Sequence, residues 1–364
     1  MRWGGRPPPV LAPLGTLRAR MVHSCDAEER AIPPHPEGKR EAMERQTADR
    51  QWRVRSQQEL NLLTLQLVRA LQRTYEPGRD RIITPENVYQ PGREEGRAEL
   101  EAFMEHVLAP GSAVEGAQHL DHCLAELEAG RSVLFLPEHR GNLDVPSFAV
   151  LLRRSYPRAA EIARRLIYIA GRKLNESSDL IKMFSEKYSR LVIVPRRDFP
   201  PDNPQASEAE RQAREEFIQY AARINRAAFR ELVRLKKAGH IFVLFPLGGR
   251  WKPDQDNIPV AETTSYIRSF DAAFLVSMEG NTLPVRERME EERPIQERVL
   301  FRVGPPLESK AFLAAQRARY DLLQQQGSAE ARVEFDQFVV NQVMLMLANL
   351  RATGGYGEIA TPAL

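Results

Sequence analysis

From about residue 130 onward, short apolar runs alternate with amphipathic helical segments. The runs with the length and composition of buried strands are 132–136, 166–170, 191–194, 241–245, 272–277 and 297–303. Helical periodicity covers 142–155, 178–188, 208–238, 308–325 and 330–350. This alternation predicts an α/β fold over residues 130–364, with a mostly parallel mixed sheet flanked by helices.

The first third of the chain has a different pattern. Residues 1–40 are rich in Pro, Gly and Arg and have no periodicity, which predicts a disordered leader. From Glu41 to Thr74, apolar residues recur on one side of a predicted helix: Trp52, Leu60, Leu63, Leu67, Val68 and Leu71. Two more helices are predicted at 94–108 and 114–129. We therefore expect residues 41–129 to form a small N-terminal helical domain.

Composition bounds the class of protein. Of the 364 residues, 42% are hydrophobic and 28% charged, and the net charge is only +3, as expected for a globular protein without a dominant basic surface. The two cysteines, Cys25 and Cys123, lack metal-ligand spacing, which favours a reducing compartment and no metal. No apolar run reaches the roughly 18 residues of a membrane span.

We therefore expect a soluble protein in the cytoplasm, with at most peripheral contact with a membrane. The leader has no acidic residue before Asp26, a feature of transit peptides, and a plastid stroma would follow if it is one. The leader is also rich in Pro and poor in Ser. An unstructured leader, or a start at Met21 or Met43, is therefore the preferred interpretation.

The stretch VLFLPEHRGNLDVPSF, residues 133–148, combines a strand, a turn and a helix start. Pro137 ends the strand, His139 follows in the turn, and Asn142 is the expected N-cap of the next helix. In an open α/β sheet, ligands bind at this carboxyl edge. Asp144 is close enough to hold one imidazole nitrogen of His139, while the other takes a proton from a substrate hydroxyl. The alternative is a surface turn in which this pair has no function.

Glycines and cations follow three of the predicted strands at the same edge. They are Gly171 after the second strand, Arg196 and Arg197 after the third, and Gly248, Gly249, Arg250 and Lys252 after the fourth. Adjacent glycines let backbone amides approach an anion, and the planar guanidinium matches a phosphate. Isolated charges after strands are usually solvated, but several at one edge favour an anionic substrate.

Five sequence blocks resemble one enzyme family. His139-Arg-Gly-Asn-Leu-Asp144 matches the H-x4-D signature of glycerolipid acyltransferases. The match is closest to the soluble plastid-type and bacterial glycerol-3-phosphate 1-acyltransferases, in which an AG pair, a basic pair and a P-S-G-G-R block follow. The corresponding residues here are Ala170-Gly171, Arg196-Arg197 and Pro246-Leu-Gly-Gly-Arg250-Trp-Lys252-Pro253-Asp254, and Met278–Pro284 fits a last block. The resemblance covers roughly residues 130–290.

The resemblance implies transfer of a fatty acyl group from acyl-carrier protein or acyl-CoA to the sn-1 hydroxyl of glycerol 3-phosphate. The product would be lysophosphatidate. His139 and Asp144 would be catalytic, and Arg196, Arg197, Gly248, Gly249, Arg250 and Lys252 would hold the phosphate, with no cofactor or metal. Two positions depart from the pattern: Leu247 replaces the Ser of P-S-G-G-R, and Asp198 replaces the His that can follow the basic pair. Asp198 reverses the charge of one expected anion contact.

Other functions remain open. The same chemistry on lysophosphatidate or another lysolipid would require an apolar groove beside the phosphate site. A non-enzymatic binder of anionic lipid or nucleic acid is a second class, but nucleic-acid binding is disfavoured because acids interrupt the basic residues and only 7% of residues are aromatic. One predicted helical stretch carries five arginines and forms either a solvated face or a docking surface for acidic carrier protein or lipid: Arg153, Arg154, Arg158, Arg164 and Arg165.

Overall fold

The computed structural model describes residues 52–176, 178–288 and 291–357, all within one compact unit that begins at Trp52. The predictions made for the leader and for residues 41–51 lie outside this part of the chain. None of the helices in the described ranges combines the length and apolarity needed to cross a membrane.

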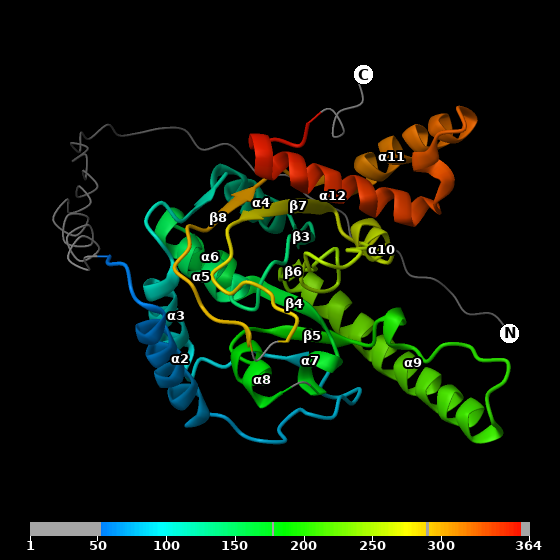
Figure 1. The fold of residues 1–364 in the computed structure, drawn as a ribbon. Coiled ribbons are helices and arrows are strands. Elements are labelled where there is room, and N and C mark those ends of the chain that lie inside the picture. The colour runs from blue at the N-terminus through cyan, green and yellow to red at the C-terminus, as the bar shows by residue number, and fades with distance from the viewer. Residues whose placement is uncertain (1–51, 177, 289–290, 358–364) are drawn as a thin grey trace, which may run out of the picture. The chain divides into compact units, whose positions relative to one another are not determined.

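The strands of the described residues form one mixed sheet in the order β1-β5-β4-β6-β3-β7-β8-β2, with β9 beside β7 (Figure 1). Their bounds are β1 Tyr89–Gln90, β2 Ala113–Glu115, β3 Val133–Pro137, β4 Leu166–Gly171, β5 Arg190–Ile193, β6 Ile241–Val243, β7 Ala272–Glu279, β8 Leu300–Val303 and β9 Leu307–Glu308. The central strands β5, β4, β6, β3 and β7 pair in parallel. β1, β8 and β9 pair antiparallel with their neighbours β5 and β7. The predicted fold class is therefore confirmed.

Helices cover both faces of this sheet. On one side lie α2 (Gln57–Gln72), α3 (Arg97–Val107), α4 (Gln118–Glu128), α5 (Asp144–Ser155) and α6 (Ala159–Arg165). On the other lie α9 (Glu208–Lys237), α10 (Thr263–Ser269) and α12 (Phe335–Thr353), and α11 (Ser309–Gln325) packs on α12. The short α7 (Lys173–Glu176) and α8 (Asp179–Ser185) follow β4.

Strand β3 shows why the sheet is covered twice. Val133 and Phe135 belong to the core on the α3 and α5 side, while Leu134 and Leu136 belong to the core on the α9 and α12 side. Successive side chains of a strand point to opposite faces, so a strand buried on both faces is a continuous apolar run. This explains why the central strands were predictable from sequence.

Helix α2 is shorter than predicted because a capping box fixes its first turn. The Ser56 side chain accepts the backbone N–H of Glu59, and the Glu59 carboxylate accepts the backbone N–H of Ser56. The helix therefore starts at Gln57. Trp52, which was predicted on its apolar face, precedes the helix and is 39% exposed.

The helices before residue 130 share a core with the sheet. Leu67 of α2 and Leu100 of α3 belong to the same buried cluster as Phe135 of β3. The compact unit consequently runs through the domain boundary predicted near residue 130. The helix predicted at 114–129 begins only at Gln118, because residues 113–115 form β2 and pair with β8.

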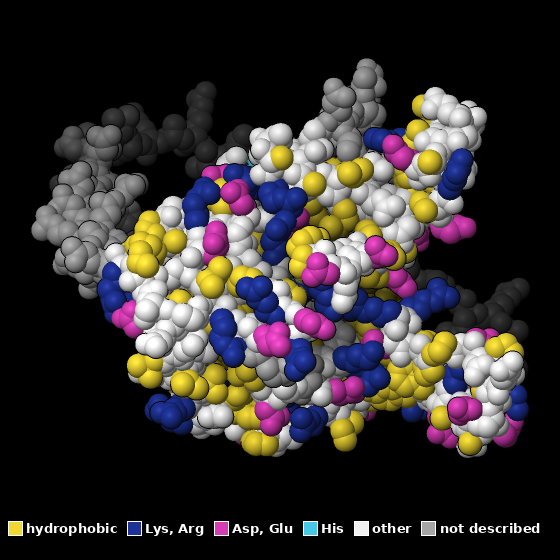
Figure 2. Space-filling model, viewed as in Figure 1, with side chains coloured by type: hydrophobic (Ala, Val, Ile, Leu, Met, Phe, Trp, Pro, Cys, Tyr) yellow, Lys and Arg dark blue, Asp and Glu magenta, His cyan; other side chains and the backbone are white. Residues whose placement is uncertain are grey.

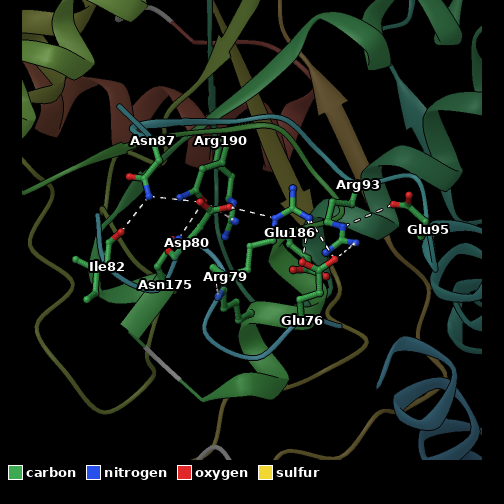
Figure 3. A network of polar contacts seen from close by, with 12 residues as sticks. Glu76, Arg79, Asp80, Ile82, Asn87, Arg93, Glu95, Asn175, Glu186 and Arg190 are labelled. Atoms are coloured by element: carbon green, nitrogen blue, oxygen red, sulfur yellow. Dashed lines mark hydrogen bonds and ion pairs between the residues drawn. The ribbon is translucent and has the colours of Figure 1, made fainter. Parts of the chain in front are cut away.

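A polar network fixes the segment between α2 and α3 against α7, α8 and β5 (Figure 3). Asn175 donates to the carbonyl of Asp80 at 2.8 Å and to the side chain of Gln90 at 2.9 Å. Arg190 donates to the same Gln90 oxygen at 2.7 Å. Burial of its guanidinium lowers the pKa of Arg190 to about 10. These contacts hold a long segment in which the two-residue strand β1 is the regular element.

Candidate active site

His139 and Asp144 meet in the turn between β3 and α5. The Nδ1 atom of His139 lies 2.9 Å from Oδ2 of Asp144, and the Asp144 side chain is only 5% exposed. With Nδ1 protonated and donating to the carboxylate, Nε2 carries the free lone pair of a neutral imidazole. The pair predicted from sequence thus has the geometry of a base and the group that orients it.

Asp144 also closes the turn. Its Oδ2 accepts the backbone N–H groups of Arg140 at 2.6 Å and Gly141 at 2.9 Å. The prediction that Asn142 caps the helix is wrong, because α5 begins at Asp144 and Leu143 occupies the N-cap position. One carboxylate therefore sets both the imidazole and the backbone that carries it.

The His139 side chain is also held from the other side of the turn. Its ring stacks on Phe245, which follows β6, with centroids 4.2 Å apart and planes at 21°. The backbone N–H of Trp251 donates to the carbonyl of His139 at 2.7 Å. The first contact favours one orientation of the ring and the second holds the backbone that carries it, both of which help to position a base.

His139 lines a cavity of about 620 Å³. Most of its wall is apolar and comes from α2, α3, α8 and the start of α5: Leu67, Val68, Leu100, Phe103, Leu143, Val145, Leu180, Ile181 and Phe184. A cavity of this size and lining suits an apolar ligand with one polar, reactive group.

Three cations, Lys173, Arg190 and Arg197, line the same cavity. Arg197 donates to the backbone carbonyls of Leu247 and Gly248, which links the ends of β5 and β6. A Cβ on Gly248, at φ +62°, would lie 2.7 Å from the Arg197 guanidinium, so glycine is needed here. Lys173 forms an ion pair of 2.7 Å with Asp198. The reversed charge at Asp198 is therefore neutralised locally.

The other predicted anion-binding residues lie outside the lining of this cavity. Arg196 is exposed and lines a second cavity, on the α9 side of the sheet. Lys252 is exposed, and its backbone N–H donates to Asn257 at 2.8 Å. Gly249 has open space where a Cβ would be. Of the predicted phosphate contacts, Arg197 and Gly248 alone among the described residues line the His139 cavity.

Arg250 is paired with a carboxylate that the sequence did not indicate. Its guanidinium contacts Oε1 of Glu292 at 2.5 Å, and the Glu292 side chain is 2% exposed. Asn142 donates to the other carboxylate oxygen of Glu292 at 3.3 Å. Glu292 also lines the cavity beside His139, so it connects the turn after β3 with the loop after β6.

Glu292 had no local signal in the sequence, since it lies 42 residues from Arg250 in a segment without strand or helix periodicity. Lys173 could have been found, because it follows Gly171 by two positions at the end of a predicted strand.

Three of the five arginines considered as a docking surface have acidic partners. Arg153 pairs with Glu101 at 2.8 Å, Arg154 pairs with Glu105, and Arg158 pairs with Glu161 at 2.8 Å. On the face shown in Figure 2, Lys and Arg side chains are likewise interspersed with Asp and Glu. These contacts are those of a solvated face, and a docking role for these arginines stays a prediction.

No family model and no curated protein sequence matches the chain. Among solved structures, it is similar to the crystal structure of the 1-acyl-sn-glycerophosphate (LPA) acyltransferase PlsC from Thermotoga maritima. The two are 15% identical, the match covers 81% of this chain and 97% of that one, and the TM-score is 0.38. At this level of similarity, function has to be argued from the site itself.

Proposed function

We propose that the chain is an acyltransferase that moves a fatty acyl group from an acyl thioester to the sn-1 hydroxyl of glycerol 3-phosphate. The acyl donor is carried by acyl-carrier protein or coenzyme A. The observation that carries the proposal is the His139–Asp144 pair, whose imidazole lies in the wall of an apolar cavity that Lys173 and Arg197 also line. The H-x4-D resemblance supports the same reaction.

In this mechanism, Nε2 of His139 removes the proton from the acceptor hydroxyl. The resulting alkoxide oxygen attacks the thioester carbonyl carbon, and the C–S bond breaks as the tetrahedral intermediate collapses. The thiolate leaves with the proton that His139 holds. Asp144 stabilises the imidazolium during these steps through the 2.9 Å contact with Nδ1.

The cavity supplies binding energy for both substrates. Its apolar wall suits the alkyl chain of the donor, and burial contributes about 0.8 kcal/mol for each methylene group. Arg197 favours a phosphate dianion near His139, whereas the charge of Lys173 is already balanced by Asp198. Holding the hydroxyl against the base replaces a bimolecular encounter with a local step, which is a large part of the rate gain.

The test is release of free thiol from a palmitoyl thioester by the purified protein. We expect release when glycerol 3-phosphate is present and little without an acceptor. Parallel reactions with lysophosphatidate compare the alternative acceptor. His139→Ala should abolish release, and His122→Ala, at an exposed histidine outside the cavity, is the matched control. Thiol release that needs no acceptor, or that survives His139→Ala, would exclude the proposed reaction.

A further inference from the structure

A second cavity, of about 960 Å³, lies on the opposite face of the sheet from the helical layer. Its apolar wall comes from β5, α9 and the segment before α10, and includes Leu191, Ile193, Ala228, Phe229, Leu232, Ile258, Val260 and Tyr266. We call it the α9 groove. Phe229 and Ile258 are 62% and 69% exposed, so a substantial apolar surface faces solvent. Exposed apolar area of this kind commonly marks a binding site.

The α9 groove adjoins the cavity of His139. Gly171, Pro195, Arg197 and Gly248 line both spaces. A Cβ on Gly171 would lie 3.3 Å from the Pro195 ring, and one on Gly248 would meet Arg197 at 2.7 Å. The partition is therefore thin, and Arg197 stands at the junction of the two cavities.

Two polar groups of the groove, on Arg196 and Thr263, have free bonding capacity. Arg196 is exposed at its wall, and within the described ranges its side chain has no hydrogen bond or ion pair. The Thr263 hydroxyl is buried without a partner there, and the residue is 1% exposed. Glu262 is the acidic residue of the lining. Two arginines against one exposed carboxylate leave an excess of positive charge beside an apolar channel.

We propose that the α9 groove binds a single-chain amphiphile with a phosphate headgroup. The alkyl chain lies between α9 and the segment before α10, and the phosphate lies against Arg196 and Arg197. Lysophosphatidate has this chemistry, and so has a simple alkyl phosphate. The inference concerns binding and needs no chemistry at His139. It shares Arg197 with the phosphate contact of the proposed acyl transfer, so the experiments below distinguish the two sites.

The test is calorimetric titration of the full chain with 1-palmitoyl lysophosphatidate below its micelle concentration. Ser265→Trp places a bulky side chain at an exposed position of the groove wall, and Arg196→Glu reverses the free cation. Each should weaken binding about tenfold or more. The matched controls are Ala318→Trp and Arg223→Glu, at exposed helix positions that line neither cavity, and both should bind as the unmodified chain does.

Two further measurements locate the ligand and identify its headgroup. Thr64→Trp narrows the His139 cavity from α2 and should leave groove binding intact. Monopalmitoylglycerol, which has the chain without the phosphate, should bind about tenfold more weakly. The proposal is overturned if Ser265→Trp binds like its control, if Thr64→Trp removes the binding instead, or if the neutral lipid binds equally well. Groove binding in a His139→Ala variant that has lost thiol release separates this site from the catalytic one.

Discussion

The imidazole of His139 has one partner that orients it and one nitrogen left for chemistry. Replacing it by alanine removes the base, so we expect turnover to fall by about two to four orders of magnitude. The melting temperature should change little, because the His139 side chain is partly exposed and fills no core position. Steady-state rates and thermal unfolding of His139→Ala and His122→Ala measure both. Near-full turnover in a folded His139→Ala protein would contradict the role of a base.

Asp144 stabilises the backbone of the turn in addition to orienting His139. Because Oδ2 accepts two backbone N–H groups as well as the imidazole, Asp144→Asn weakens the turn and also disturbs the tautomer of His139. We expect a smaller loss of turnover than for His139→Ala, together with a lower melting temperature. An unchanged melting temperature would show that the turn holds without the carboxylate.

Arg250 has an ion pair with a carboxylate that is almost fully buried, which changes what its truncation should do. Arg250→Ala leaves the Glu292 charge without its cation, and breaking a buried pair costs about 3 kcal/mol of folding stability. If Arg250 also binds the acceptor phosphate, the KM for glycerol 3-phosphate (the acceptor constant) rises as well. Arg250→Lys keeps the charge but not the planar fork, and should show an intermediate effect on the acceptor constant.

The double variant Arg250→Ala with Glu292→Gln separates these contributions. It removes the uncompensated charge, so stability should recover, while a phosphate contact would remain lost. The measurements are the melting temperature and the two substrate constants. If the acceptor constant returns to normal along with stability, Arg250 acts only through the ion pair and does not bind phosphate.

At the level of elements, the strands were predictable where local pattern and burial coincide. β3, β4, β5, β6 and β7 are apolar runs because both faces of the sheet are covered, and their predicted bounds differ by at most two residues from those observed. β1, β2 and β9 were missed, since two or three residues carry no periodicity and exist only through pairing with β5, β8 and β7. The helix α7 was missed because its four residues are too few to show helical periodicity.

The contacts of the candidate site also divide into those that the sequence predicts and those that only the fold brings together. His139 and Asp144 are five positions apart, so the turn itself brings them together and sequence suffices. Glu292 reaches Arg250 and Asn142 only through the path of the chain after β7. Glu138, next to the base, accepts the N–H of Met278 at 2.8 Å and pairs with Arg351 of α12. Contacts over such separations depend on the fold and leave no pattern in one sequence.

Asp271, at the start of β7, gives the fold a pH dependence. The backbone N–H and then the hydroxyl of Ser132 hold its pKa below the ordinary value by hydrogen bonding, with Oδ2 at 2.8 and 2.7 Å. A lowered folded pKa contributes stability above the unfolded value, near 3.9, which is lost as the pH falls through the folded pKa.

The unmodified protein should therefore have a higher free energy of unfolding than Asp271→Asn. This difference should be largest at pH 7 and shrink below about pH 4. Denaturant unfolding at both pH values measures it. Asp254→Asn, at an exposed residue away from the sheet, controls for the loss of one negative charge. An equal difference in free energy of unfolding at pH 3 and pH 7 would exclude this dependence on the protonation of Asp271.

At the scale of the whole molecule, the helical layer and the sheet together enclose the space beside His139. α2, α3 and α8 contribute one wall of the cavity, and the turn after β3 contributes the reactive side. The helices before residue 130, which share a buried core with β3, thus form part of the candidate site. In the proposed reaction, the position of these helices sets the length of alkyl chain that the donor can carry.

This arrangement predicts that a bulky residue on the inner face of α2 shortens the accepted donor chain. Thr64 lines the cavity, whereas Leu62, on the same helix, is 56% exposed and does not line it. Thr64→Trp should lower kcat/KM for a 16-carbon thioester by about tenfold relative to an 8-carbon one, since excluding two methylene groups forfeits about 1.6 kcal/mol. Leu62→Trp should leave this ratio unchanged. The ratio of kcat/KM for the two thioesters, measured with each variant, tests the assignment. If both variants keep the ratio of the unmodified protein, the donor chain does not lie in the cavity beneath α2, and the alkyl group must reach His139 from another side.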